Sequence, residues 1–226
     1  MFYKILKFTT SLGSRNFLNF LIDQTYLKLA YYGKMNTKLN LNNPKSFTEK
    51  LQWLKLNDRN PLYTELVDKY EVREYIKEKL GEEYLIPLIA VYDRVDDIEW
   101  DKLPNQFVIK CTHGSGSNII CKDKNKLSIK ETNKQLKKWM RKNWYWFGRE
   151  WPYKNVKPRI IIEKFMIDKK SKQLKDYKLM CFNGSPEIIQ VMSNRLNGKY
   201  NLNHFSLSWD VLNYERTGLL PSKEKV

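Results

Sequence analysis

The residues best suited to chemistry lie in one glycine- and serine-rich stretch, residues 107–121. An apolar run ends near Lys110, the short loop 113–117 follows, and a second apolar run leaves the loop. Small residues let backbone N–H groups crowd around phosphate oxygens, and a lysine at the end of a strand supplies compensating charge. The stretch therefore predicts a phosphate-binding loop, with an ordinary glycine hairpin as the alternative.

The order of residues in this stretch excludes two common nucleotide motifs. A Walker A loop places Gly-Lys-Ser/Thr after its glycines and before a helix, whereas Lys110 precedes the glycines and a strand pattern follows them. A G-x-G-x-x-G fingerprint is also absent. The loop is therefore not a P-loop, and it lacks the dinucleotide-binding fingerprint.

Two further segments suit a nucleotide. Lys69 follows Asp68 at a predicted helix N-terminus, where exposed N–H groups favour anions. Residues 159–165 form an apolar strand pattern that ends in Glu163, Lys164 and Phe165. Because adenine needs an apolar surface with a few placed polar partners, this strand end is a candidate for binding the base.

His113 is a candidate general base beside the loop, although a loop residue that only makes hydrogen bonds is the favoured interpretation. His113 and His204 are the only histidines, and the three cysteines form no Cys-x-x-Cys pair. Neither a zinc site nor a disulfide framework is therefore predicted.

The elements that must position these residues predict an α+β fold. Helix starts of capping-box type occur at Ser46, Asp68 and Ser128, each with Glu three residues later. Strand patterns cover residues 85–92, 107–112, 118–121, 159–165, 177–182 and 187–192, and Asn183-Gly184 predicts a hairpin turn.

Composition and charge limit the class of protein. The 226 residues are 42% hydrophobic, and 41 Lys and Arg against 25 Asp and Glu give a formal charge of +16. No apolar run reaches the roughly 18 residues that span a bilayer, so we expect a soluble cytoplasmic protein. Its positive field attracts nucleotides, nucleic acid, anionic lipid and acidic polymers alike.

The first 40 or so residues show helix-compatible apolar spacing, with lysines such as Lys28 and Lys34 at the edges. Such a helix either packs on its own domain or touches a membrane surface. We expect packing, with peripheral contact on the inner face of the membrane as the alternative.

Several multi-residue blocks resemble the TupA-like ATP-grasp family of teichuronopeptide and surface-polysaccharide biosynthesis. The blocks occupy residues 43–56, 58–70, 110–116, 148–153 and 176–184, and the resemblance covers about residues 40 to 215. It implies two α+β subdomains that clamp a nucleotide. We expect a basic helical segment over residues 1–60 and an ATP-grasp domain, incomplete at its C-terminal end, over residues 61–226.

The resemblance also implies roles for individual residues. Lys69 and Lys110 would hold the α and β phosphates, and the loop residues Gly114, Ser115, Gly116 and Ser117 would close over the triphosphate. Glu163, Lys164 and Phe165 would form the adenine-binding edge. Lys178 and Arg195 are further candidates in the family's clamp, with surface charges as the alternative.

The reaction implied is ATP-dependent ligation of a carboxylate to an amine through an acyl phosphate, with Mg²⁺. The basic surface would suit an acidic polysaccharide or amino-acid substrate. The Asp and Glu-x-Asn strands that normally bind Mg²⁺ near the end of such domains are missing from this chain. Two interpretations follow: the chain is a fragment, or it binds ATP with little turnover.

Two other functions compete with this one. A glycosyltransferase of the same type of pathway is disfavoured because the chain has no Asp-x-Asp motif. A nucleic-acid-binding module is suggested by the aromatic and basic residues between Lys138 and Trp151. It is also disfavoured, since the consecutive aromatics from Trp144 to Phe147 must partly face inward.

Overall fold

The computed structural model describes residues 18–168, 174–193 and 201–214. The chain divides into two compact units, Met1–Phe165 and Met166–Val226. The boundary expected at residue 60 falls inside the first unit; as the start of the family domain it stays a prediction. The expected α+β class is confirmed, because each unit contains an antiparallel sheet and the first adds helices.

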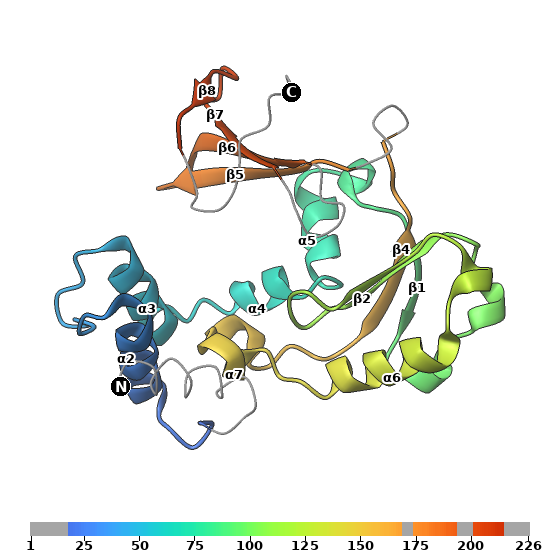
Figure 1. The fold of residues 1–226 in the computed structure, drawn as a ribbon, viewed down its shortest axis with the longest axis horizontal. Coiled ribbons are helices and arrows are strands. Elements are labelled where there is room, and N and C mark those ends of the chain that lie inside the picture. Colours follow the sequence, from blue (N-terminus) through green and yellow to red (C-terminus); the bar gives the residue numbers. More distant parts are fainter. Residues whose placement is uncertain (1–17, 169–173, 194–200, 215–226) are drawn as a thin grey trace. The chain divides into compact units, whose positions relative to one another are not determined.

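The sheet of the first unit has the order β1-β4-β2-β3 (Figure 1). Its strands are β1 (Leu88–Tyr92), β2 (Phe107–Cys111), β3 (Asn118–Cys121) and β4 (Ile160–Lys164), and all neighbours are antiparallel. These strands confirm the first four strand patterns to within a few residues. The chain inserts β4 between β1 and β2, and its three consecutive isoleucines are fully buried there.

The two faces of this sheet differ. Phe107, Ile109, Cys111, Ile160 and Ile162 join Val95, Ile98, Leu103 and Leu136 in the main apolar core. Residues that face each other across an antiparallel ladder point to the same side, and neighbours along a strand alternate. Val108 lies opposite Glu163 and Lys110 opposite Ile161. The opposite face therefore carries both Lys110 and Glu163.

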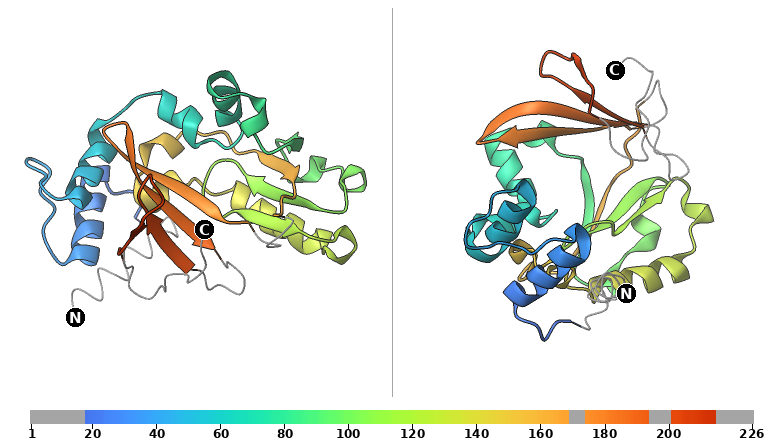
Figure 2. Two further views of the ribbon diagram at one scale, coloured as in Figure 1. Left: turned by 90° about the horizontal axis from the view of Figure 1, so that it is seen from above. Right: turned by 60° about the vertical axis from the view of Figure 1, so that its left-hand side comes forward.

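Helices surround this sheet (Figures 1 and 2). The α-helices are α2 (Asp23–Met35), α3 (Phe47–Asn57), α4 (Leu62–Val67), α5 (Val72–Lys79), α6 (Ile129–Met140) and α7 (Tyr145–Gly148). Short 3₁₀ turns are Glu82–Tyr84, Val95–Asp97, Trp100–Lys102, Lys124–Lys126 and Trp151–Tyr153. Within the described residues, the longest helix has 13 residues, and none is both long and apolar enough to cross a membrane.

The capping predictions had mixed outcomes. Ser46 and Glu49 form a reciprocal capping box at α3, and Ser128 accepts a hydrogen bond from the Glu131 N–H at α6. The prediction for Asp68 is wrong, because α5 begins at Val72 without a side-chain cap. Asp68 is instead 2% exposed and bonds to distant residues.

One buried arginine joins the N-terminal helices to the rest of the first unit. The Arg149 side chain is 1% exposed, and its Cζ lies 4.7 Å from the Tyr26 ring centroid and 4.5 Å from that of Trp146. Its Nη2 donates to the Leu18 carbonyl at 2.9 Å, and its Nη1 lies 3.4 Å from Asp23 Oδ1. The described N-terminal segment, from Leu18 through α2, is therefore packed against the first unit.

The second unit is an antiparallel meander of order β5-β6-β7-β8. Its strands are β5 (Asp176–Phe182), β6 (Ser185–Ser193), β7 (Asn201–Phe205) and β8 (Val211–Leu212). Asn183 and Gly184 have φ of 51° and 85°, which confirms the predicted turn. The sequence did not predict β7 or β8. The polar Asn201 and Asn203 hide the strand pattern of β7, and β8 has only two residues.

Candidate functional site

A buried carboxylate holds two cations on the polar face of the first sheet. Glu163 is 6% exposed, and its Oε2 lies 2.5 Å from Lys110 Nζ. Its Oε1 lies 3.4 Å from Arg73 Nη1, and Arg73 Nη2 donates to the Ile86 carbonyl at 2.9 Å. One negative charge therefore faces two positive charges, and the cluster keeps an excess of one positive charge.

Lys69 lies against the glycine loop. Its ammonium donates to the Gly114 carbonyl and, at 3.4 Å, to the Thr112 carbonyl, which also accepts from the Lys69 backbone N–H at 3.3 Å. Burial, and next the charge of Lys110, lower the pKa of Lys69. The structure thus brings Lys69, Lys110 and the loop together, as the sequence pattern indicated.

The loop 113–117 has the geometry of an anion site. The Cys111 N–H donates to the Ser117 carbonyl at 3.0 Å and closes the loop, and Gly116 has a left-handed φ of +73°. A Cβ at Gly114 would lie 3.0 Å from Trp144 Cε3, so a larger residue there would require the Trp144 ring or the loop to shift. The N–H groups of Ser115 and Gly116 donate to no atom of the described protein. They are free to donate to phosphate oxygens.

His113 anchors this loop. The side chain is buried, and its Nε2 donates to the Trp139 carbonyl near the end of α6 at 3.2 Å. Its Nδ1 has no partner among the described residues. Burial lowers the pKa of His113, so the ring is neutral at pH 7. A role in holding the loop follows from these contacts, and the role as general base stays a prediction.

A second charge network holds the Lys69 segment in place. Asp68 accepts from the Tyr70 N–H at 2.8 Å, and its Oδ2 lies 3.3 Å from Arg159 Nη1. Arg159 also pairs with Glu71 at 2.7 Å. The Arg159 N–H donates to Thr112 Oγ1 at 3.2 Å, which ties the network to the residue before His113.

Sequence reasoning missed Asp68, Arg73 and Arg159 as members of the site. The sequence pattern predicts Asp68 as a helix cap and assigns no role to Arg73 or Arg159. The available signal was their placement: Asp68 directly precedes Lys69, Arg73 lies one helical turn beyond Lys69, and Arg159 opens the strand that ends in Glu163.

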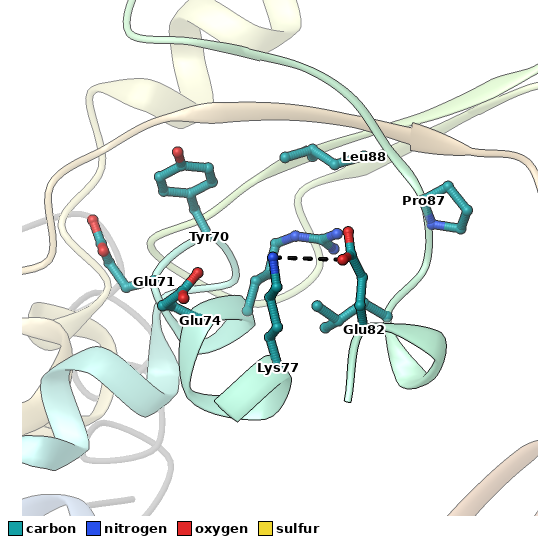
Figure 3. Close-up of a pocket in the computed structure, with 9 residues that line it drawn as sticks. Tyr70, Glu71, Glu74, Lys77, Glu82, Pro87 and Leu88 are labelled. Carbon is teal, nitrogen blue, oxygen red and sulfur yellow. Dashed lines mark ion pairs between the residues drawn. The ribbon is translucent and has the colours of Figure 1, made fainter. Parts of the chain in front are cut away.

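A depression of about 610 Å³ shares Arg73 with the Glu163 cluster, and Figure 3 shows the residues that line it. It is lined by Tyr70, Glu71, Arg73, Glu74, Lys77, Glu82, Leu85, Pro87 and Leu88. Arg73 belongs to both the cluster and the depression, and Leu88 is the register partner of Glu163. The charged face thus continues into a hollow that has an apolar wall.

The other site residues predicted from the sequence are Lys164, Phe165, Lys178 and Arg195. Lys164 is exposed and its N–H donates to the Pro87 carbonyl at 2.9 Å, while Phe165 is half-buried. Their adenine-binding role, like that of Glu163, stays a prediction. Lys178 is exposed on β5 of the second unit, opposite Gln190. Arg195 lies outside the described residues.

Among the side chains that the structure describes, no group of three or more His, Cys, Asp and Glu residues is placed to hold a metal ion.

The comparisons with known proteins place the chain in a family. The model of the TupA-like ATP-grasp family matches residues 49–217, about three quarters of the chain. The chain belongs to the TupA-like ATP-grasp family. The match includes the Lys69 segment, the 113–117 loop and the strand that ends in Glu163. Searches of the curated proteins and of the solved structures returned no match.

The first unit of this ATP-grasp protein fits a nucleotide triphosphate by its own chemistry. Free N–H groups at Ser115 and Gly116 and the ammonium groups of Lys69 and Lys110 are the donors that phosphate oxygens require. Their positive charge exceeds that of the nearby carboxylate Glu163.

Proposed function

We propose that the chain binds ATP on the polar face of the first sheet and uses it to join a carboxylate to an amine. The observation that carries the proposal is the convergence of Lys69, Lys110 and the free N–H groups of loop 113–117 in a member of an ATP-grasp family. Membership of an ATP-grasp family supports the proposed ligase chemistry, and the geometry supports the proposed phosphate site.

In the proposed reaction, a carboxylate oxygen attacks the γ-phosphorus of ATP, and ADP leaves. An amine nitrogen then attacks the acyl carbon, phosphate leaves, the nitrogen loses a proton and an amide forms. Lys69 and Lys110 would neutralise the phosphate charge, which is the main catalytic need of the first step. The 113–117 loop would keep water from the acyl phosphate.

Glu163 gives Lys110 a partner before the nucleotide arrives. Phosphate oxygens would compete for the Lys110 ammonium, which now lies 2.5 Å from Glu163 Oε2. Arg73, at 3.4 Å, would then remain as the counter-charge of the buried carboxylate. Nucleotide binding therefore exchanges one ion pair for another and leaves no buried charge alone.

The net charge of the chain supports an acidic substrate. A formal charge of +16 favours acidic acceptors, so we propose an acidic polysaccharide or acidic amino acid of cell-surface polymer synthesis as the ligase substrate. Mg²⁺ is proposed to enter with ATP, as it does in phosphoryl transfer generally.

The test is calorimetric titration of Mg·ATP into the wild-type chain and into Lys110→Ala and Lys69→Ala. Each variant should bind at least about tenfold more weakly, because it removes a charge-assisted phosphate contact. Lys137→Ala is the matched control, since Lys137 forms a 2.6 Å surface ion pair with Asp96. Equal affinity in all four proteins would contradict the proposed phosphate site.

A second measurement addresses the reaction. ADP release should require both an acidic carboxylate and an amine, and hydroxylamine should trap the acyl phosphate in place of the amine. ADP release that is independent of any carboxylate would contradict the ligase proposal while leaving ATP binding intact.

A further inference from the structure

The N-terminal helices and the residues just before them expose eight large apolar side chains. The set is Phe20, Ile22, Leu29, Met35, Phe47, Leu51, Trp53 and Leu54, with exposed fractions from 37% to 78%. The helices that carry most of them lie side by side (Figure 2), and Tyr31 Oη of α2 lies 3.3 Å from Thr48 Oγ1 of α3. These eight side chains are here named the α2–α3 surface.

Helix α3 presents a continuous outward face. Phe47, Lys50, Leu51 and Leu54 recur at helical spacing, and all four are exposed. The opposite side of α3 is engaged with the unit, since Leu56 packs against the buried cluster that includes Tyr26 and Tyr31. Apolar residues at i, i+4 and i+7 normally face a core. Here the same pattern faces outward.

Lysines outnumber carboxylates around this surface. Residues 18–57 contain six lysines, of which Lys28, Lys34, Lys38, Lys45 and Lys50 are exposed. The two carboxylates of the segment are occupied: Asp23 pairs with Arg149 at 3.4 Å, and Glu49 accepts from the Ser46 N–H at 2.9 Å. The surface is therefore apolar and positive, without a free carboxylate.

We propose that the α2–α3 surface binds the interface of an anionic lipid bilayer. Apolar side chains with a tryptophan enter the interface of a bilayer, and exposed lysines attract anionic headgroups. Charge complementarity selects this occupant, because a second copy of the chain would bring the same lysines against each other. The inference is independent of the proposed ligase function.

Attachment of these helices to the unit gives the surface a fixed position. Arg149 bonds to the carbonyls of Leu18 and Leu21 and stacks on Tyr26. A bilayer bound through Phe47, Leu51 and Leu54 would therefore hold the whole first unit at the membrane.

The test is cosedimentation of the full chain with vesicles of phosphatidylcholine alone and of phosphatidylcholine mixed with phosphatidylglycerol. We expect binding to the mixed vesicles that falls steeply at high salt. The Phe47→Ser/Leu54→Ser variant should lower the partition coefficient about tenfold or more. Lys45→Gln/Lys50→Gln should lower it by a similar factor on the anionic vesicles only.

Leu80→Ser/Tyr84→Ser is the matched control, because Leu80 and Tyr84 are equally exposed, at 62% and 68%, outside residues 18–57. It should bind vesicles as the wild type does, and all variants should keep their thermal unfolding and their affinity for Mg·ATP. No binding to anionic vesicles by the folded wild type would overturn the proposal. So would a dimer in light scattering that Phe47→Ser/Leu54→Ser dissociates, since the occupant would then be a second copy.

Discussion

At the scale of single residues, Glu163 sets the electrostatics of the candidate site. It is the shared partner of Lys110 and Arg73, whose side chains are 26% and 16% exposed. The attraction between this carboxylate and two half-buried cations offsets part of the free-energy cost of their desolvation. The arrangement holds the Lys110 ammonium on the polar face of the sheet, where a phosphate oxygen could bind it.

Replacing Glu163 by Gln should destabilise the chain by about 2 to 4 kcal/mol, because two partly buried cations lose their counter-charge. Urea unfolding at neutral pH measures the change. Glu150→Gln is the comparison, since Glu150 is 46% exposed and lies 3.9 Å from Lys55, so its loss should cost less than about 1 kcal/mol. An equal loss of unfolding free energy in the two variants would contradict the role of Glu163 as the counter-charge of Lys110 and Arg73.

Gly114 and Gly116 should respond differently to alanine. Gly114→Ala places a Cβ 3.0 Å from Trp144, so we expect a loss of about 1 to 3 kcal/mol and weaker ATP binding as the loop shifts. Gly116→Ala meets no atom within 4 Å but keeps a φ of +73°, which costs about 1 kcal/mol of backbone strain. Unfolding curves and ATP titrations on both variants separate steric from conformational cost.

His113 predicts a pH dependence of stability. Burial lowers the pKa of His113 below the ordinary 6.5, and the charge of Lys69 lowers it further. At acidic pH the His113 ring is therefore protonated more readily in the unfolded chain than in the folded chain. The stability that the neutral His113 ring contributes is present above pH 6.5, the ordinary pKa of histidine, and is lost as the pH falls below that value. His113→Gln should flatten this acid limb in urea unfolding, whereas His204→Gln should retain it. An unchanged limb in His113→Gln would assign the titration to another group.

At the scale of elements, the capping interactions show how local sequence fixes local structure. Ser46 and Glu49 satisfy each other's backbone N–H groups at α3, and hydrogen bonds from the Ser46 and Lys45 backbones hold the pKa of Glu49 below its usual value. Ser128 makes only a 3.4 Å contact at α6. The first cap is the more complete of the two.

Ser46→Ala should therefore cost about 1 kcal/mol, near the middle of the range for N-cap loss. Ser128→Ala should cost less, because its bond to the Glu131 N–H is longer. Thermal unfolding of both variants gives the order, and a larger loss at Ser128 would reverse the ranking of the caps.

At the scale of the whole molecule, Arg149 joins segments that are distant in the chain. Its bond to the Leu18 carbonyl spans 131 residues, and three aromatic rings surround its guanidinium. Tyr145 and Trp146 are thereby turned toward a buried cation. They are not free to stack nucleic-acid bases.

Arg149→Ala should cost about 3 kcal/mol or more, because it leaves Asp23 and two carbonyls without their buried donor. Hydrogen exchange should accelerate in α2 ahead of the β1-β4-β2-β3 sheet. Arg141→Ala, at an exposed position, is the control. Equal protection of α2 in both variants would show that other contacts hold the N-terminal helices.

The sequence by itself determined the family blocks, the positions of the first six strands and the hairpin turn at Asn183-Gly184. These depend on local periodicity, turn chemistry and short motifs. Tertiary structure decided which partner each charge takes. Glu163 meets Arg73 across 90 residues, and Asp68 meets Arg159 across 91. Local patterns carry no record of such pairs, because the path of the chain brings them together and burial then requires every charge to be paired.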